Sequence, residues 1–347
     1  MAEKHWTDQA AIDAWLEWLE GTRGRSKRTV EAYGMAVRRL HEYLQQEGVA
    51  LLDVDAGQLE LFSGLYLHKK GVVARSRIPY ISALRGFFAF AQARRMVARN
   101  PAAKLSHPKT GMPLPRTISL ANAERLMWAP DMGTFIGIRD AAMLALLIGC
   151  GPRVSGLVAL NESSLRPIQV GNEARLAVVF REKGQKERML PVPKEADMLL
   201  RVYLGHEELK AIDRDIMVKD GQGTHPDRVL FVSVRSTILR PDEHRGEKRR
   251  LTRKAVHDMV QRYGRRLGIP LEELHPHAFR HLFGTELTED DVSLASTQDL
   301  MGHADPKSTS IYIRLAQRRK AKLIDQNAPL AKMRTPVSEL LKRLPPG

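Results

Sequence analysis

Residues 139–157 read RDAAMLALLIGCGPRVSGL, and this stretch decides how the second half of the chain folds. Residues 141–150 are apolar apart from one glycine, which indicates a helix buried in a globular core. Two glycines and a proline then end the helix, and Arg153 follows at the turn. Cys150 is the single cysteine, so a disulfide within the chain and a cysteine zinc site are excluded, and a buried thiol is expected.

Downstream of this stretch, strand-like segments lie among helical ones. Residues 175–180 and 189–192 flank a polar turn and predict a β-hairpin, and residues 229–234 predict a further short strand. Apolar residues at helical spacing predict helices over 119–128, 194–204, 252–267, 277–287, 294–301 and 308–315. Residues 235–250 end in a very basic run and predict an exposed loop. We therefore expect a small sheet among helices.

The first part of the chain has a helical pattern only. It predicts helices over 9–19, 26–46, 55–66 and 77–94, with Ser26 capping the second. Residues 104–118 contain three prolines and no periodicity, which is typical of a linker. The expected organisation is a helical domain over 1–107, a linker over 108–118, a second domain over 119–325 and a tail over 326–347.

The charge of the chain is strongly positive. Lys and Arg number 55 against 40 acidic residues, a net charge of +15, which favours a polyanionic partner over a merely basic surface. No acidic residue lies between Leu61 and Ala123, and such a one-signed run favours phosphate contacts. The candidate DNA contacts are Lys27, Arg28, Lys69, Lys70, Arg75, Arg77, Arg85 and Lys109. No apolar stretch reaches the ~18–20 residues of a membrane span and no signal segment is visible, so a cytoplasmic protein without membrane contact is expected.

The C-terminal half contains the groups that phosphodiester cleavage requires. The reaction needs a nucleophile, cations on the non-bridging oxygens and an acid for the leaving oxygen. Four segments offer them in order: 149–157 with Arg153, 182–188 with Lys183, 275–281 with His277 and Arg280, and 301–312 with His303 and Tyr312. Each segment alone is more often an ordinary surface or core feature, so only the four segments in this order indicate phosphodiester cleavage.

In that order the segments resemble the tyrosine recombinase family, and within it the Xer- and phage-integrase-like branch. The matching motifs are Cys-Gly-Pro-Arg153, Glu-Lys183-Gly-Gln-Lys-Glu-Arg, His277-Ala-Phe-Arg280-His281, and Met-Gly-His303 with Tyr312 nine residues later. Residues 26–33, 84–88 and 99–102 resemble the family's core-binding domain, and the resemblance covers residues 8–325. It implies a mainly α fold with a small antiparallel β-sheet in the catalytic domain, and two domains that form a C-shaped clamp on DNA.

The resemblance also implies six catalytic roles. Tyr312 would attack the phosphate and form a 3′-phosphotyrosine, while Arg153 and Arg280 clamp the phosphate. Lys183 would protonate the 5′-oxygen, His277 would exchange the tyrosine proton, and His303 would hydrogen-bond a phosphate oxygen. No metal and no cofactor is implied.

The implied function is site-specific cleavage and religation of DNA, with strand exchange through a Holliday junction. It would serve integration or excision of a mobile element, or Xer-like resolution. The implied partners are double-stranded DNA with an inverted-repeat core site and three further copies of the chain in a homotetramer, with an accessory protein as an optional addition. The tail over 326–347 would dock on a neighbouring protomer through Val337, Leu340, Leu341 and Leu344, the alternative being a tail packed on its own chain.

One departure from the family pattern leaves an alternative function open. Gly156 stands where the family places Glu or Asp, which predicts a weakened or differently braced site. The alternative is a catalytically weakened or partner-dependent DNA-binding protein of the same fold. A type IB topoisomerase shares the tyrosine chemistry, but the short N-terminal domain and the motif order disfavour it. A metal-dependent nuclease would need ligands beyond the histidines at 275, 277, 281 and 303, and Glu273 and Asp305 match no ligand pattern.

Overall fold

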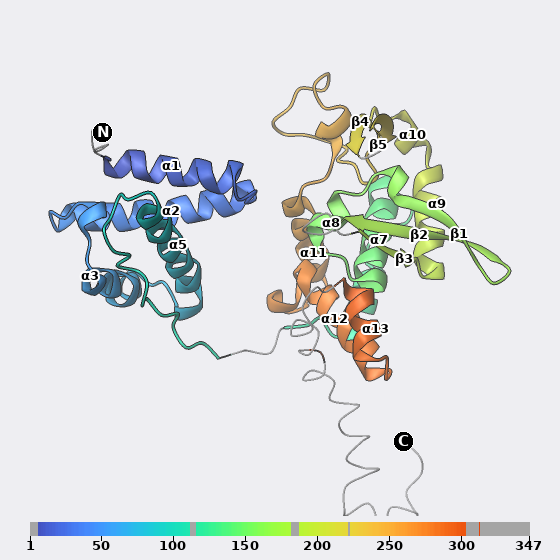
Figure 1. Ribbon diagram of the computed structural model, residues 1–347. Coiled ribbons are helices and arrows are strands. Elements are labelled where there is room, and N and C mark those ends of the chain that lie inside the picture. Colours follow the sequence, from blue (N-terminus) through green and yellow to red (C-terminus); the bar gives the residue numbers. More distant parts are fainter. Residues whose placement is uncertain (1–5, 112–115, 182–186, 221–222, 303–311, 313–347) are drawn as a thin grey trace, which may run out of the picture. The chain divides into compact units, whose positions relative to one another are not determined.

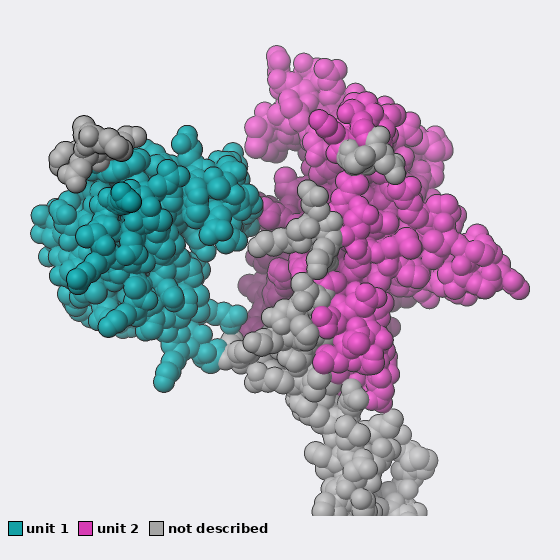
Figure 2. Space-filling model, in the orientation of Figure 1, with its two compact units in different colours: residues 1–113 teal, residues 114–347 magenta. Residues whose placement is uncertain are grey.

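The computed structural model describes residues 6–111, 116–181, 187–220, 223–302 and Tyr312. The chain divides into two compact units, residues 1–113 and residues 114–347 (Figure 2). The division falls inside the segment 108–118 that the sequence predicts to be a linker. Within the described residues, none of the helices combines the length and apolarity that crossing a bilayer requires.

The regular elements in the described part of unit 1 are all helical (Figure 1). Its helices are α1 (Asp8–Gly21), α2 (Lys27–Gln46), α3 (Ala56–Leu61), α4 (Leu67–Lys69) and α5 (Ala74–Ala93), with a 3-10 turn η1 (Leu51–Asp53) and a π-helical turn η2 (Phe62–Tyr66). All four predicted helices are confirmed, and the Ser26 hydroxyl accepts the Thr29 N–H as expected of an N-cap. The third predicted helix continues from α3 through η2 into α4.

Aromatic side chains fill the core of unit 1. Trp15 of α1 is fully buried, stacks on Tyr33 of α2 at 6.0 Å and meets Phe87 of α5 edge-on at 5.5 Å. Because aromatic pairs add about 0.5–1.5 kcal/mol beyond their buried area, Trp15 joins the three long helices.

The strands of unit 2 form two small antiparallel sheets. The first contains β1 (Leu165–Val170), β2 (Glu173–Arg181) and β3 (Glu187–Pro191) in that order, and the second pairs β4 (Asp215–Asp220) with β5 (Gly223–Arg228). The predicted hairpin is therefore confirmed as β2–β3, with Phe180 opposite Arg188. The sequence patterns did not predict β1, β4 or β5.

The strand predicted over 229–234 is wrong. Val229 and Val232 each make one isolated bridge only, to Asn161 and to Arg250. The segment is apolar because it is buried, but its backbone partners belong to irregular chain, such as the Leu160 carbonyl that accepts the Leu230 N–H. A short apolar run therefore indicates burial, and it does not by itself distinguish a strand from a buried irregular segment.

Helices surround the sheets of unit 2. They are α6 (Leu120–Met127), α7 (Phe135–Cys150), α8 (Val154–Val158), α9 (Lys194–Gly205), α10 (Glu207–Ala211), α11 (Arg253–Arg266), α12 (Pro276–Glu289) and α13 (Leu294–Met301), with 3-10 turns η3 (Glu162–Ser164), η4 (Gly246–Arg249) and η5 (Leu271–Glu273). Helix α7 is almost wholly buried and packs against α9 and α12. The predicted helices up to 301 are confirmed, whereas the helix over 308–315, apart from Tyr312, and the tail over 326–347 lie outside the described residues.

A buried carboxylate fixes α7 against α11. Asp140 is fully buried and accepts hydrogen bonds from the Arg139 side chain, from Arg262 at 3.0 Å and from the Tyr263 hydroxyl at 3.0 Å. A buried charge is tolerated only with such partners, so this cluster specifies how the two helices meet.

The basic run expected to be an exposed loop is partly built into the unit. Arg250 donates to the carbonyl oxygens of Val158 and Leu160 at 2.9 and 3.0 Å, and His244 is buried beside Ser233. Arg240 and Lys248 remain exposed. The expectation fails for the last residues because their guanidiniums donate hydrogen bonds to backbone oxygens of the unit.

Candidate active site

The turn after α7 presents Arg153. Helix α7 ends at Cys150, and its C-cap residue Gly151 has a left-handed φ of 53°; a Cβ there would lie 2.6 Å from the Phe283 ring. Only glycine fits this position without strain or a clash. Pro152 then leads into Arg153, which is the N-cap residue of α8 and is half-buried. The glycine-rich motif therefore acts by reversing the chain and placing an arginine between two helices.

Helix α12 presents His277 and Arg280. His275 is its N-cap, with Nδ1 accepting the Ala278 N–H at 3.0 Å, and Pro276 occupies the first helical position. Arg280 is 4% exposed and donates from Nη1 to the Gly151 carbonyl at 2.6 Å and from Nη2 to the Met301 carbonyl. Arg280 therefore joins the end of α7 to the end of α13.

A second buried arginine lies beside the first. Arg188 of β3 is 7% exposed, and its Nη1 donates to the Cys150 carbonyl at 3.4 Å and to the Leu300 carbonyl. Its guanidinium also lies over the Phe180 ring, 5.1 Å from the centroid. The candidate site thus contains three arginines, at 153, 188 and 280, from three different elements.

Tyr312 lies against α12. Its side chain is 2% exposed, and a Cβ added to Gly284 would lie 2.6 Å from the phenol ring, so the ring rests on bare helix backbone. The Tyr312 hydroxyl lies 3.5 Å from His281 Nδ1, at the outer limit of a hydrogen bond. In this arrangement the hydroxyl is shielded from solvent.

Electrostatic interactions connect these groups. Burial raises the pKa of Tyr312, whereas the charges of Arg280 and Arg153 oppose that rise by favouring the phenolate. Burial, with the neighbouring charges of Arg153 and Arg188, lowers the pKa of Arg280 to about 9, so Arg280 is still protonated at neutral pH. Desolvation and then the two arginines at 280 and 153 lower the pKa of His277, although part of the imidazole faces solvent. Positive charge is therefore concentrated around one tyrosine.

Four of the six predicted catalytic residues fall in the described part of the chain, and the structure brings all four together: Arg153, His277, Arg280 and Tyr312. Lys183 and His303 lie outside the described residues. Their flanks are described, because Arg181 and Glu187 pair at 3.2 Å across the hairpin and Gly302 ends α13 in a left-handed conformation.

The candidate DNA contacts in unit 1 differ in exposure. Those with exposed side chains are Lys27, Arg28, Lys69, Lys70, Arg75, Arg85 and Lys109. Arg77 is half-buried and its Nη1 donates to the Gly64 carbonyl at 3.1 Å, so it holds α5 against η2.

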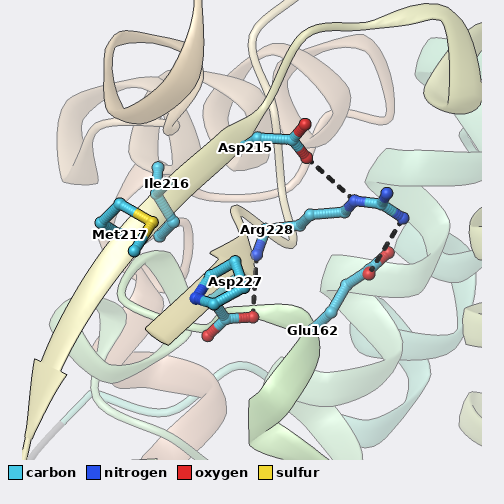
Figure 3. Close-up of a pocket in the computed structure, with 7 residues that line it drawn as sticks. Glu162, Asp215, Ile216, Met217, Asp227 and Arg228 are labelled. Atoms are coloured by element: carbon cyan, nitrogen blue, oxygen red, sulfur yellow. Dashed lines mark hydrogen bonds and ion pairs between the residues drawn. The ribbon is translucent and has the colours of Figure 1, made fainter. Parts of the chain in front are cut away.

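A separate hollow in unit 2 contains none of the predicted site residues. Figure 3 shows it beside β4 and β5, where it has a volume of about 550 Å³. Arg228 donates to Asp215 at 2.9 Å there and lies 3.8 Å from Glu162. Among the described residues, no three His, Cys, Asp or Glu side chains are arranged to hold a metal ion, and His303 and Asp305 are outside that part.

Sequence reasoning did not single out three residues that shape the site. Arg188 ends a quoted motif but resembles an ordinary hairpin residue, and His281 resembles a surface neighbour of Arg280. Gly284 has no local signal except that a glycine inside a helix is unfavourable and usually has a packing reason. Only the tertiary contacts with Leu300 and Tyr312 show what these residues do.

Comparisons with known proteins agree with this geometry. Residues 116–319 match the phage integrase family, and residues 12–95 match the phage integrase N-terminal SAM-like domain. The chain is 33% identical to the tyrosine recombinase XerD of Pseudomonas putida, over 93% of this chain and 98% of that protein. It is 34% identical to the tyrosine recombinase XerC of Azotobacter vinelandii, over 94% and 98% of the two chains.

Solved structures share the fold. A XerH site-specific recombinase bound to a palindromic difH substrate superposes with a TM-score of 0.68 at 17% identity, covering 94% of this chain and 91% of that one. A lambda integrase dimer bound to a COC′ core site gives a TM-score of 0.60 at 17% identity, covering 90% and 77%. The predicted fold class, mainly α with small antiparallel sheets, is confirmed. The family match over more than half of the chain and the near full-length relatives lead to one conclusion: the chain belongs to the phage integrase family of tyrosine recombinases, enzymes that cleave and rejoin DNA strands.

Proposed function

We propose that this recombinase forms a 3′-phosphotyrosine intermediate with Tyr312 as the nucleophile. The observation that carries the proposal is the convergence of two arginines, from α8 and α12, on one buried tyrosine. A free tyrosine has a pKa of about 10, so attack at neutral pH requires cations that stabilise the charge developing in the transition state. Arg153 and Arg280 supply that charge.

The two arginines clamp the scissile phosphate. Guanidinium offers five N–H donors in a fixed plane, and the bonds of Arg280 to the Gly151 and Met301 carbonyls hold that plane in place at the site. Carbonyl oxygens carry only partial charge, so these two bonds do not neutralise the guanidinium. The arginines do in this site what a metal ion does in many other nucleases.

The proton transfers are assigned to three further residues. Lys183 protonates the 5′-oxygen, His277 accepts or returns the tyrosine proton, and His303 hydrogen-bonds a phosphate oxygen. The support for His277 is its position beside both arginines: burial, followed by the charges of Arg280 and Arg153, lowers its pKa and favours a neutral acceptor. Its role differs from that of His281, which contacts the hydroxyl of the buried tyrosine.

The buried position of Tyr312 is a resting state. A side chain that is 2% exposed cannot reach a phosphate of a duplex, so DNA binding has to release it from Gly284. The exposed basic residues of unit 1 contact the DNA backbone. Four protomers assemble on an inverted-repeat core site and exchange strands through a Holliday junction, and the tail over 326–347 docks on a neighbouring protomer.

Xer-like resolution is the biological role we favour, because the chain matches proteins named XerC and XerD over almost their whole length. Integration or excision of a mobile element uses the same chemistry on a different arrangement of sites. Plasmids that carry two selected sites separate these roles, since resolution of direct repeats without an added protein supports the first and a requirement for an accessory protein supports the second.

A suicide-substrate assay tests the chemistry. Binding sites are selected from random duplexes, nicked near the centre, and incubated in EDTA with wild type and Tyr312→Phe. We expect a covalent protein–DNA band in the wild type only, with equal binding by both proteins. Binding without any adduct by the wild type would instead support the catalytically weakened, partner-dependent alternative, with Gly156 as the first position to restore.

A further inference from the structure

Two helix ends meet at the candidate site. Helix α7 ends at Cys150 and helix α13 at Met301, and both are followed by a left-handed glycine, with φ of 53° at Gly151 and 63° at Gly302. The last carbonyls of a helix lack intrahelical partners and carry the negative end of the helix dipole. Two such ends facing one another repel unless cations lie between them.

Arg188 and Arg280 lie between these ends in parallel. Arg188 donates to the Cys150 and Leu300 carbonyls, and Arg280 donates to the next carbonyl along each helix, at Gly151 and Met301. The two side chains come from different elements, β3 and α12, yet form equivalent bridges one residue apart. Each bridge therefore restrains the same pair of helix ends.

The cost of burying Arg188 indicates that this bridge matters. Burial lowers the pKa of Arg188 to about 10, and the charge of Arg153 adds to that effect, whereas Cys150 and Asp299 oppose it. A buried cation is retained only with hydrogen-bond partners, and the flat guanidinium also stacks on Phe180. A hydrophobic residue would be cheaper here if filling space were the only requirement.

We propose that Arg188 is a positioning residue that fixes the turn carrying Arg153 relative to Arg280, so that both guanidiniums meet one phosphate. This inference rests on the proposed function of those two arginines. Without Arg188, the Arg280 bridge would lose its parallel partner, and the Arg280 guanidinium would be held less firmly. Arg188 does not itself touch the phosphate.

Cleavage kinetics test the proposal with Arg188→Lys, Arg188→Met and a matched control, Arg166→Met, which removes an exposed arginine of the same sheet. We expect single-turnover cleavage to fall on the order of 10²-fold in Arg188→Met, less in Arg188→Lys, and not in the control, with DNA affinity unchanged in all three. A substrate with sulfur in place of the 5′-oxygen needs no general acid. We expect the same loss on that substrate, because the clamp serves both leaving groups. If the variants cleaved the sulfur substrate at the wild-type rate, Arg188 would act by supporting the general acid Lys183, and this would overturn the proposal.

Hydrogen exchange tests the restraint independently of catalysis. We expect faster amide exchange at the ends of α7 and α13 in Arg188→Lys and Arg188→Met, with α9 unchanged and no effect in Arg166→Met. Equal protection in all four proteins would overturn the proposal whatever the kinetics. If the wild type shows no adduct while the exchange result holds, the proposed function fails and the positioning by Arg188 stands.

Discussion

Arginines in two regions of unit 2 have different partners, and their pKa values shift in opposite directions. At the β4–β5 hairpin, Arg228 bonds the Asp215 carboxylate at 2.9 Å and lies near Glu162, and these carboxylates raise the pKa of Arg228 (Figure 3). At the candidate site, Arg280 donates to backbone carbonyls, and burial and neighbouring arginines lower its pKa to about 9.

The difference separates an arginine paired with carboxylates from an arginine held by backbone carbonyls. A carboxylate neutralises its partner, so Arg228 gains little from a further anion. Carbonyls orient a guanidinium but leave its net charge, and the charge of Arg153 repels those of Arg188 and Arg280. A phosphate would relieve that repulsion, and this is the physical basis for assigning the site to DNA cleavage.

The largest expected effect is the difference in cleavage rate between two variants, each of which lacks one arginine from one of the two regions. We expect Arg280→Met to lower single-turnover cleavage on the order of 10³-fold, because it removes charge from the developing transition state. Arg228→Met should change cleavage less than about twofold, because its ion pairs lie at the surface. Comparable losses in the two variants would break the comparison.

A smaller effect is expected where the tyrosine meets the helix. Gly284→Ala adds a Cβ that would lie 2.6 Å from the Tyr312 ring, so it should destabilise the resting state. We expect cleavage to accelerate by up to about tenfold, which corresponds to about 1.4 kcal/mol, and Tyr312 to become reactive to nitration without DNA. The control is Gly205→Ala, where a Cβ meets nothing within 4 Å. Slower cleavage with an intact fold would mean that Gly284 seats the attacking tyrosine.

The histidine next to the tyrosine should make stability depend on pH. Burial, followed by the charges of His277, His275 and Arg280, lowers the pKa of His281 to about 4. In the unfolded chain a histidine has a pKa of about 6.5, so the unfolded state binds more protons as pH falls below that value. Stability contributed by the neutral ring is thus complete above pH ~6.5 and is lost towards pH ~4.

Urea unfolding at pH 7 and pH 4.5 measures this dependence. The unfolding free energy of the wild type should fall between pH 7 and pH 4.5, and His281→Asn should make this fall smaller by on the order of 2 kcal/mol. This value is below the one that the full pKa shift of His281 would give, because the ring is partly exposed. Identical pH profiles for variant and wild type would show that burial and the neighbouring charges do not hold His281 neutral.

Adding a carboxylate to the candidate site sharpens the comparison further. Gly156 is the third residue of α8, and a Cβ there would make only ordinary contact, 3.7 Å from Phe180. Gly156→Ala should raise unfolding free energy by up to about 1 kcal/mol through helix propensity. Gly156→Glu can in addition accept the Arg153 backbone N–H, as in a capping box, so cleavage should rise a few-fold in Glu but not in Ala. Equal cleavage in both would refute a bracing role for the carboxylate.

The smallest change concerns DNA binding by unit 1. Exposed Lys69 and Lys70 should each contribute about one unit to the slope of log affinity against log salt, whereas half-buried Arg77 should contribute none. Filter binding by a Lys69→Ala and Lys70→Ala double variant, beside Arg77→Met, measures both slopes. A lower slope in Arg77→Met would assign that side chain to DNA.

Local sequence rules predicted the parts of the structure that local chemistry determines. Capped amphipathic helices such as α2 and the β2–β3 hairpin follow from spacing and turn residues. The strand β5 contains Pro226 and few strand-forming residues, so its pairing depends on contacts such as the Arg228–Asp215 ion pair. Such pairing has no local signal.

The candidate site shows the same division. Motif order identified Arg153, His277, Arg280 and Tyr312, because each role needs one residue type. The supports are different: Arg188 and Gly284 act through partners more than 25 residues away in the chain, Leu300 and Tyr312. Only the folded arrangement reveals that the arginines bind carbonyls and keep their charge.

The most direct test of the account is to identify the residue that carries the DNA. The covalent adduct is trapped on a suicide substrate, digested with nuclease and protease, and mapped by mass spectrometry. We predict a single nucleotide-bearing peptide with the phosphodiester on Tyr312. The nucleotide on any other residue would contradict the account, because the arginine cluster would then surround a tyrosine that does no chemistry.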